Sequence, residues 1–187
     1  MMVHDATGRD ITVKARQTRS SSIKIMAMLR RLIFQRTGAR AIVGAQDDQT
    51  TKLFRAKIWH FVSALRSAGF EFAIGDNNED ELVFKDTENR IQFVSGEQRI
   101  MGRAFAAQEV LLSELAHWKP ATVDKLLGGL IPSVPAAPHG HIDFESTPAG
   151  EAGAFYKYAM DAIPLSANPD AEFTVHFYPW WLEPRYT

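Results

Sequence analysis

The sequence predicts one α/β domain, residues 1–187, in which helices cover both faces of a mostly parallel sheet. Short β-branched or apolar runs alternate along the chain with segments of helical periodicity, and this alternation is typical of parallel sheets with helical crossovers. The chain has 187 residues, of which 45% are hydrophobic and 23% charged, so it is long enough and apolar enough to build its own core.

The first half of the chain predicts two strand–helix units. A strand at 11–14 precedes a helix that the serines at 20–22 are suited to cap. A second strand at 39–45 precedes a long helix that opens at Asp47 and ends at Gly69. Both helices repeat apolar residues at the spacing of one buried face: Ile25, Met28, Leu29 and Leu32 in the first, and Phe54, Ile58, Phe61 and Leu65 in the second.

The second half of the chain predicts shorter elements, and two of its strands form a hairpin at 81–94. The expected elements, in order, are strands at 70–74, 81–84, 90–94 and 110–112, a helix at 121–131, a strand at 141–145, a helix at 153–162 and a last strand at 173–178.

Composition excludes several classes of protein. Twenty-one Lys and Arg against 22 Asp and Glu leave a formal charge of -1, which excludes a uniformly basic DNA coat. Cysteine is absent, so disulfides, thiol nucleophiles and Cys-ligated zinc are excluded. No apolar run approaches the roughly 20 residues of a membrane span, and the start does not resemble a signal peptide. We therefore expect a soluble, intracellular protein with no membrane partner.

Polar segments follow three of the predicted strands, at 14–22, 112–114 and 145–147. Ligands bind outside the carboxyl ends of strands in open parallel sheets, so the three segments converge on one crevice if their strands are neighbours. The first segment combines backbone amides at a helix start with cations and hydroxyls, which are the parts of a phosphate site. It lacks the glycines and the G-x-x-x-x-G-K-[ST] pattern of a consensus P-loop, so an exposed, capped basic helix remains the alternative.

The other two segments offer an acid and two hydroxyls. Glu114 follows an apolar strand, where an acid can polarise a water beside a magnesium-bound phosphate. The alternative is a plain surface Glu at the end of a strand. Ser146 and Thr147 are equally typical of ordinary turn chemistry.

Two further features favour structural roles. His139 and His141 would share a face of a strand, but the pair lacks a third metal ligand. The aromatic cluster at 177–181 is interpreted as core or as a domain edge rather than as a platform for stacking bases.

Taken in order, these segments resemble the ATPase domain of the large terminase subunit, the motor that packages DNA in tailed phages. Lys14-Ala15-Arg16-Gln17 with its Ser-rich helix start is similar to that family's deviant Walker A, K-x-R-Q-x-G-x-S-T. Val110-Leu111-Leu112-Ser113-Glu114 resembles the Walker B region, with Ser-Glu in place of Asp-Glu. Glu145-Ser146-Thr147-Pro148-Ala149-Gly150 is similar to the E-S-T-x-x-G coupling motif, and the segment at 177–186 resembles the F-x-P-W segment where the ATPase domain ends.

The resemblance implies a P-loop NTPase-like (ASCE-type) three-layer domain that hydrolyses ATP with Mg²⁺ and drives viral double-stranded DNA into procapsids. It implies that Glu114 activates the attacking water, that Ser21 holds Mg²⁺ and that Ser113 helps to place the water shell of the metal. Ser146 and Thr147 would couple hydrolysis to DNA movement. The implied ATP- and phosphate-binding residues are Lys14, Arg16, Gln17, Thr18, Arg19, Ser20, Ser21 and Ser22.

The resemblance also implies partners. These are the small terminase subunit, the portal and further copies of the chain in a ring, all in the cytoplasm of the host cell. Arg103 is a candidate arginine finger, either in its own site or in that of a neighbour. Because the chain stops at Thr187, we expect no C-terminal nuclease domain and no nuclease activity.

The sequence also departs from the family pattern. Arg19 and Ser20 stand where relatives carry Gly and, in some, Lys, and a side chain at the Gly position obstructs close backbone approach to phosphates. A degenerate, non-hydrolysing module that binds DNA or a protein partner is therefore an alternative. A different P-loop enzyme, such as a helicase-like translocase, is another.

Overall fold

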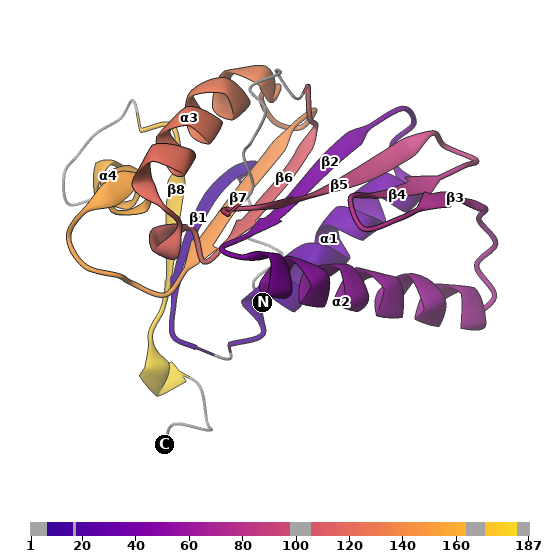
Figure 1. Cartoon of the computed structure of the whole chain (residues 1–187), viewed down its shortest axis with the longest axis horizontal. Coiled ribbons are helices and arrows are strands. Elements are labelled where there is room, and N and C mark those ends of the chain that lie inside the picture. The colour runs from indigo at the N-terminus through magenta and orange to yellow at the C-terminus, as the bar shows by residue number, and fades with distance from the viewer. Residues whose placement is uncertain (1–6, 17, 98–105, 164–170, 183–187) are drawn as a thin grey trace.

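The structure, a computed structural model, describes residues 7–16, 18–97, 106–163 and 171–182. Eight strands form one sheet in the order β3-β4-β5-β2-β6-β7-β1-β8 (Figure 1). The strands are β1 (Arg9–Lys14), β2 (Arg40–Ala45), β3 (Ile74–Asn77), β4 (Glu81–Phe84), β5 (Asn89–Ser95), β6 (Glu109–Ser113), β7 (His141–Ser146) and β8 (Thr174–Tyr178). The helices are α1 (Ser20–Phe34), α2 (Asp48–Ser67), α3 (Pro120–Leu130) and α4 (Gly153–Ala162), with 3-10 turns η1 (Leu115–His117), η2 (Ile131–Ser133) and η4 (Trp180–Leu182).

The sheet is mostly parallel, as predicted. The pairs β1–β7, β1–β8, β2–β5, β2–β6 and β6–β7 are parallel, and only β3–β4 and β4–β5 are antiparallel. Parallel neighbours end at the same edge of a sheet. The carboxyl ends of β6, β7 and β1 therefore lie side by side.

Helices cover both faces of the sheet, which confirms the three-layer prediction (Figure 1). On one face, α1 and α2 pack against the sheet through a core that includes Leu29, Ile58 and Leu111. On the other face, α3 and α4 pack through a second core that includes Leu112 and Phe155. Successive residues of β6 enter opposite cores because side chains alternate across a strand. Among the described residues, no helix has both the length and the hydropathy that crossing a bilayer requires.

One element prediction is wrong in part. The strand expected at 70–74 begins only at Ile74, because the aromatic residues before it pack on other rings instead of pairing with a strand. The Phe70 ring lies 5.4 Å from that of Phe34, and the Phe72 ring 5.9 Å from that of Phe84. Their alternation arises from packing at the sheet edge.

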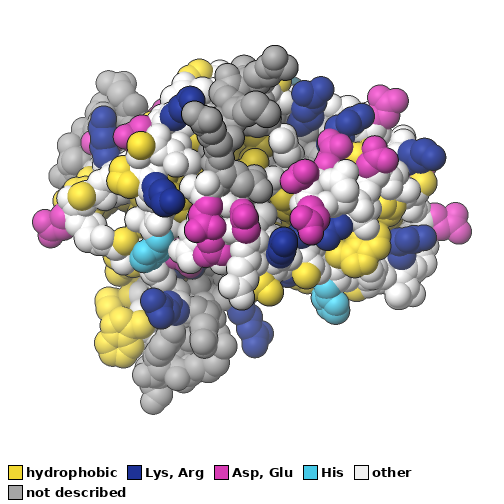
Figure 2. Space-filling view, viewed as in Figure 1, with side chains coloured by type: hydrophobic (Ala, Val, Ile, Leu, Met, Phe, Trp, Pro, Cys, Tyr) yellow, Lys and Arg dark blue, Asp and Glu magenta, His cyan; other side chains and the backbone are white. Residues whose placement is uncertain are grey.

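The aromatic cluster at 177–181 does not form core. Phe177, Trp180 and Trp181 are each more than half exposed and contact one another edge to face. Figure 2 shows hydrophobic side chains gathered at η4, next to the C-terminal end of the described chain.

Asn89 joins three segments at the amino ends of β2 and β5, which lie opposite the carboxyl ends of the parallel strands. Its buried side chain accepts a hydrogen bond from the Ala39 amide at 2.6 Å and donates to the Arg36 carbonyl at 2.9 Å. It also donates to the Leu32 carbonyl. The side chain therefore fixes the end of α1 against the beginnings of β2 and β5.

Replacing Asn89 with Ala is expected to lower the free energy of unfolding by about 2 kcal/mol, because the buried Ala39 amide loses its acceptor. Urea denaturation measures the change. Asn77→Ala, at an exposed residue with a single side-chain bond to Arg55, is the matched control and is expected to change stability by less than about 0.5 kcal/mol. Equal losses in the two variants would contradict this role for Asn89.

Candidate active site

The three polar segments predicted to converge do meet, at the carboxyl edge formed by β1, β6 and β7. Lys14 is the last residue of β1, Glu114 follows the end of β6, and Thr147 follows the end of β7. The register pairs Val13 with Ser146 and Ser113 with Glu145, so the three strands end in step.

Glu114 binds both other strand ends through its carboxylate. Lys14 Nζ lies 2.7 Å from Glu114 Oε1, and the backbone amide and hydroxyl of Thr147 each donate to Oε2 at 3.1 Å. The Ser146 hydroxyl lies 3.4 Å from the same oxygen. The backbone of Glu114 has a φ of 53°, in the left-handed region that is unfavourable for side chains other than Gly and Asn or Asp. Backbone strain of this kind clusters at functional sites, where the surrounding contacts sustain it.

The electrostatics of the site keep Glu114 ionised. Burial alone would raise the pKa of Glu114, but the hydrogen bond and charge of Lys14 and the donors of Thr147 outweigh it and lower the pKa. At neutral pH, Glu114 is therefore an anion of fixed orientation. One of its oxygens accepts hydrogen bonds from Thr147, and the other accepts one from Lys14.

The serines at the start of α1 bind a carboxylate instead of capping the helix. The N-cap residue is Arg19, and no side chain caps the helix. The Ser20 hydroxyl donates to Glu145 Oε2 at 2.6 Å, and the Ser21 hydroxyl donates to Oε1. The capping expected for residues 20–22 is thus wrong, because a buried carboxylate on β7 accepts two of the hydroxyls.

A cavity of about 340 Å³ opens beside Lys14 and Glu114, and we call it the Lys14 cavity. It contains most of the residues predicted to bind phosphate, and its lining is Lys14, Thr18, Arg19, Ser20, Ser21, Ser22, Lys57 and Glu114. The Thr18 hydroxyl is buried and has no hydrogen-bond partner among the described residues. Of the other predicted site residues, Arg16 is exposed, and Gln17 and Arg103 lie outside the described residues.

Three residues of the site had been given no role by the sequence analysis. Lys57 enters the Lys14 cavity from α2, with its Nζ 5.3 Å from the ring centre of Phe54. No local pattern distinguishes this Lys from a surface residue. His117 Nε2 lies 2.9 Å from the Thr147 hydroxyl. The buried Glu145 carboxylate accepts hydrogen bonds from the Ser20 and Ser21 hydroxyls. A signal for Glu145 did exist, because alternation along the strand at 141–145 places it on the same face as Asp143.

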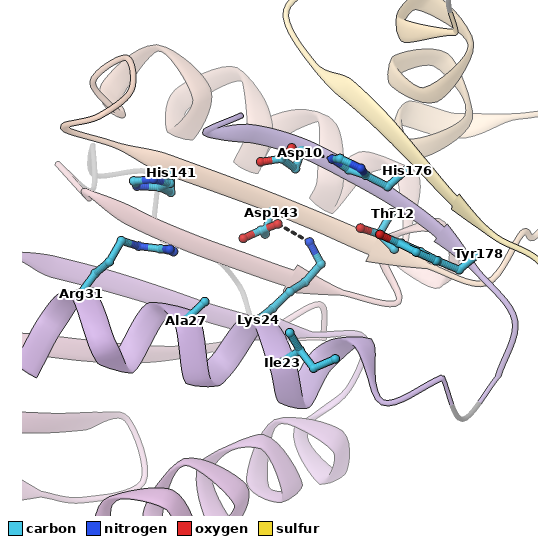
Figure 3. A pocket seen from close by; sticks show the side chains of 10 residues that line it. All are labelled: Asp10, Thr12, Ile23, Lys24, Ala27, Arg31, His141, Asp143, His176 and Tyr178. Atoms are coloured by element: carbon cyan, nitrogen blue, oxygen red, sulfur yellow. Dashed lines mark hydrogen bonds and ion pairs between the residues drawn. The ribbon is translucent and has the colours of Figure 1, made fainter. Parts of the chain in front are cut away.

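A second polar cavity, of about 50 Å³, lies between α1 and the strands β1, β7 and β8 (Figure 3). Lys24 pairs there with Asp143, and His176 Nε2 lies 2.7 Å from Asp10 Oδ1. Burial would lower the pKa of Lys24, but Asp143 and the other acids nearby raise it. This second cavity is large enough for a few waters only, so it is too small for a triphosphate.

His141 has a structural role, as the sequence favoured. Its Nδ1 lies 3.4 Å from the buried carboxylate of Glu109, which also pairs with Arg31 and Arg36. Burial raises the pKa of Glu109, and the bonds to His141 and Arg31 more than offset that effect and lower it. Within the described ranges, no three His, Cys, Asp or Glu side chains form a group that could hold a metal ion.

Comparison with known proteins identifies the fold. No family model and no curated protein matches the chain. The large terminase ATPase domain of Thermus phage P74-26 superposes with a TM-score of 0.76 and 16% identity, over 98% of this chain and 82% of that domain. The large terminase of bacteriophage HK97 gives a TM-score of 0.72 and 13% identity, over 91% of this chain and 35% of that one.

Two further similar structures contain nucleotide, and both are of one large terminase from a thermophilic bacteriophage. Its complex with ADP gives a TM-score of 0.62 and 14% identity, over 94% of this chain and 40% of that one. Its complex with ATP-γ-S gives a TM-score of 0.58 and 15% identity over the same shares. The chain therefore has the three-layer, P-loop-like fold of phage large terminase ATPase domains. It spans 35% of the HK97 protein and 40% of the thermophilic phage protein.

The ion pair between Lys14 and Glu114 makes stability depend on pH. The pKa of Glu114 is lowered from its ordinary value of 4.5, so the pair stabilises the fold above that pH and ceases to do so as the pH falls through the folded-state pKa. Lys14→Met is expected to lower the free energy of unfolding by about 2 kcal/mol at pH 7, with a difference from the unaltered protein that shrinks in acid.

Urea denaturation at pH 7 and pH 3.5 measures this difference. Lys52→Met is the control, because Lys52 and Glu79 form an exposed pair at 3.7 Å, and it is expected to change stability by less than about 0.5 kcal/mol. A loss in Lys14→Met that is equally large at both pH values would contradict the ionic origin of the effect.

Proposed function

We propose that this chain, which has the fold of phage large terminase ATPase domains, is a terminase-like ATPase motor domain that extends over residues 1–187. It binds Mg-ATP in the Lys14 cavity and hydrolyses it to move viral double-stranded DNA into procapsids. The observation that carries the proposal is the meeting of Lys14, Glu114 and Thr147, from three separate strand ends, beside a cavity rich in cations and hydroxyls. The nucleotide complexes of the similar terminase from a thermophilic phage support it.

The triphosphate is bound by the first turn of α1 and by the cations around it. Backbone amides at the start of a helix point at a bound anion, and the helix dipole favours negative charge there. Lys14 and Lys57 line the cavity, and Arg19 lies at its edge. By the resemblance, Arg16 and Gln17 also contribute to phosphate binding. The buried hydroxyl of Thr18 supplies a further donor to a phosphate oxygen.

The donors at this site suit Mg²⁺, which prefers oxygen ligands and is usually held by one or two carboxylates together with phosphates and waters. The Ser21 hydroxyl would hold the metal, and Ser113, at the end of β6, would help to place its water shell. When bound, Mg²⁺ neutralises charge on the phosphate oxygens as the terminal phosphate is transferred.

Glu114 orients the water that attacks the terminal phosphate. Lys14 Nζ donates a hydrogen bond to Glu114 Oε1, and a bound triphosphate would compete for this cation. Movement of Lys14 to the phosphates leaves Oε1 able to accept a hydrogen bond from water, while Thr147 retains Oε2. Because Ser146 and Thr147 contact the same carboxylate, a change at Glu114 reaches the coupling segment directly.

The remaining parts of the proposal rest on the resemblance. The motor acts in the host cytoplasm with the small terminase subunit and the portal. It assembles as a ring, in which Arg103 serves as arginine finger in its own site or that of a neighbour. Phosphoryl transfer needs positioned charge and not covalent catalysis, so this small group of side chains suffices.

Glu114→Gln is expected to lower the rate of ATP hydrolysis by about 10²-fold or more, because the amide cannot accept the proton of the attacking water. ATP affinity is expected to change little. Single-turnover hydrolysis and calorimetry measure the two quantities. Glu151→Gln, at an exposed acid outside the Lys14 cavity, is the matched control. An unchanged hydrolysis rate in Glu114→Gln would remove Glu114 from the mechanism.

A non-hydrolysing terminase-like module is the second candidate, and Arg19 is the observation that favours it. Arg19 lines the Lys14 cavity at the position of the family's glycine. Its φ of 60° lies in the left-handed region, so the backbone adopts the conformation that glycine favours although a side chain is present. In this second candidate, the Arg19 side chain obstructs the close approach of the backbone to phosphates that a glycine would allow.

Calorimetry of Mg-ATP binding separates the two candidates. The motor proposal predicts heat of binding for the unaltered protein and weaker binding for Arg19→Gly, because the variant loses a cation from the lining of the Lys14 cavity. The second candidate predicts no heat for the unaltered protein. Binding gained only in Arg19→Gly would identify a module closed by its own arginine.

A further inference from the structure

Glu145 carries a concentration of hydrogen bonds that its place in a coupling motif does not explain. The carboxylate is fully buried at the end of β7. It accepts hydrogen bonds from the Ser20 and Ser21 hydroxyls of α1 and, at 2.9 Å, from the Ser113 hydroxyl of β6. Three hydroxyls from two other elements thus converge on one anion.

Glu145 also stands beside the position where the resemblance leads one to expect an acid. Ser113 immediately precedes Glu114 and replaces the family's Asp. Ser113 and Glu145 are register partners on adjacent parallel strands, so they lie in the same row and on the same face of the sheet. The carboxylate missing from β6 is therefore present one strand away, about 4.8 Å across the sheet.

The pattern of donors suits a metal site. A hydroxyl has one proton to donate and two lone pairs. The Ser21 hydroxyl donates its proton to Glu145, which leaves its lone pairs free for a cation on the side of the Lys14 cavity that Ser21 lines.

The charge of Glu145 is also left without a direct ion pair. The salt bridges among the described residues do not include Glu145, and its three direct donors are neutral. Lys24 has an electrostatic interaction with Glu145, but its ammonium group forms its ion pair with Asp143. Burial of an ionised carboxylate is costly unless a cation or several hydrogen bonds compensate. A divalent cation beside Ser21 would add to that compensation when nucleotide is bound.

We propose that Glu145 is the carboxylate of the Mg²⁺ site and acts in place of an acid at residue 113. It orients the Ser21 hydroxyl and would act on the metal's water shell from behind that hydroxyl, while Ser113 donates a hydrogen bond to Glu145 from the end of β6. This inference rests on the proposed function, because the metal enters with the nucleotide. It differs from that function in assigning the metal's anion to β7 and not to β6.

The test is the effect of Mg²⁺ on ADP binding, measured by calorimetry with Mg²⁺ and with chelator. In the unaltered protein, Mg²⁺ is expected to tighten ADP binding. In Glu145→Gln, the tightening by Mg²⁺, taken as the ratio of the variant's own affinities with Mg²⁺ and with chelator, is expected to fall by about tenfold or more. Ser113→Asp combined with Glu145→Gln returns a carboxylate to β6 and is expected to recover the tightening.

Glu109→Gln is the matched control. Glu109 is a similarly buried acid at the opposite end of β6, where it pairs with Arg31, so its loss perturbs the core and not the cavity. It is expected to leave the tightening by Mg²⁺ unchanged. If Glu145→Gln does not fold, Glu145→Asp is used instead. The shorter side chain keeps the charge but moves the carboxylate away from Ser21, so Mg²⁺ is expected to tighten ADP binding less than in the unaltered protein.

The outcomes separate this inference from the proposed function. Full tightening by Mg²⁺ in folded Glu145→Gln, or in Glu145→Asp where that variant is needed, overturns the role of Glu145 and leaves the motor proposal standing. Absence of any ADP binding by the unaltered protein overturns both.

Discussion

The contact between Lys14 and Glu114 is the interaction on which the candidate site depends. It joins the ends of two strands that are not adjacent, because β7 lies between β1 and β6. Thr147, from β7, closes the arrangement by binding the other oxygen of the same carboxylate. A parallel sheet brings three strand ends to one edge. The ion pair then holds the Lys14 ammonium and the Glu114 carboxylate in a fixed arrangement at that edge.

Much of the fold and of this edge could be predicted from the sequence, because both follow from local periodicity. Strand–helix alternation indicated the layers, and polar residues after apolar runs located Lys14, Glu114 and Thr147. The beginning of β3 could not be placed, because the ring contacts of Phe70 and Phe72 imitate the alternation of a strand. The exposure of Trp180 and Trp181 likewise depends on where the chain runs after β8.

The remaining parts of the site depend on distances that no local pattern encodes. Ser20 and Ser21 resemble helix caps, and only the packing of α1 over β7 shows that Glu145 takes their hydroxyls. Lys57 reaches the cavity because α2 crosses beside α1. Arg19 has a left-handed backbone conformation, which no local pattern predicts for an arginine.

A crystal structure of the protein with Mg²⁺ and ATP-γ-S tests the central claim most directly. The claim predicts a triphosphate in the Lys14 cavity, with Lys14 Nζ transferred from Glu114 to a phosphate oxygen and the terminal phosphate facing Glu114 and Thr147. A nucleotide bound on another surface, with the contact between Lys14 and Glu114 intact, would contradict it.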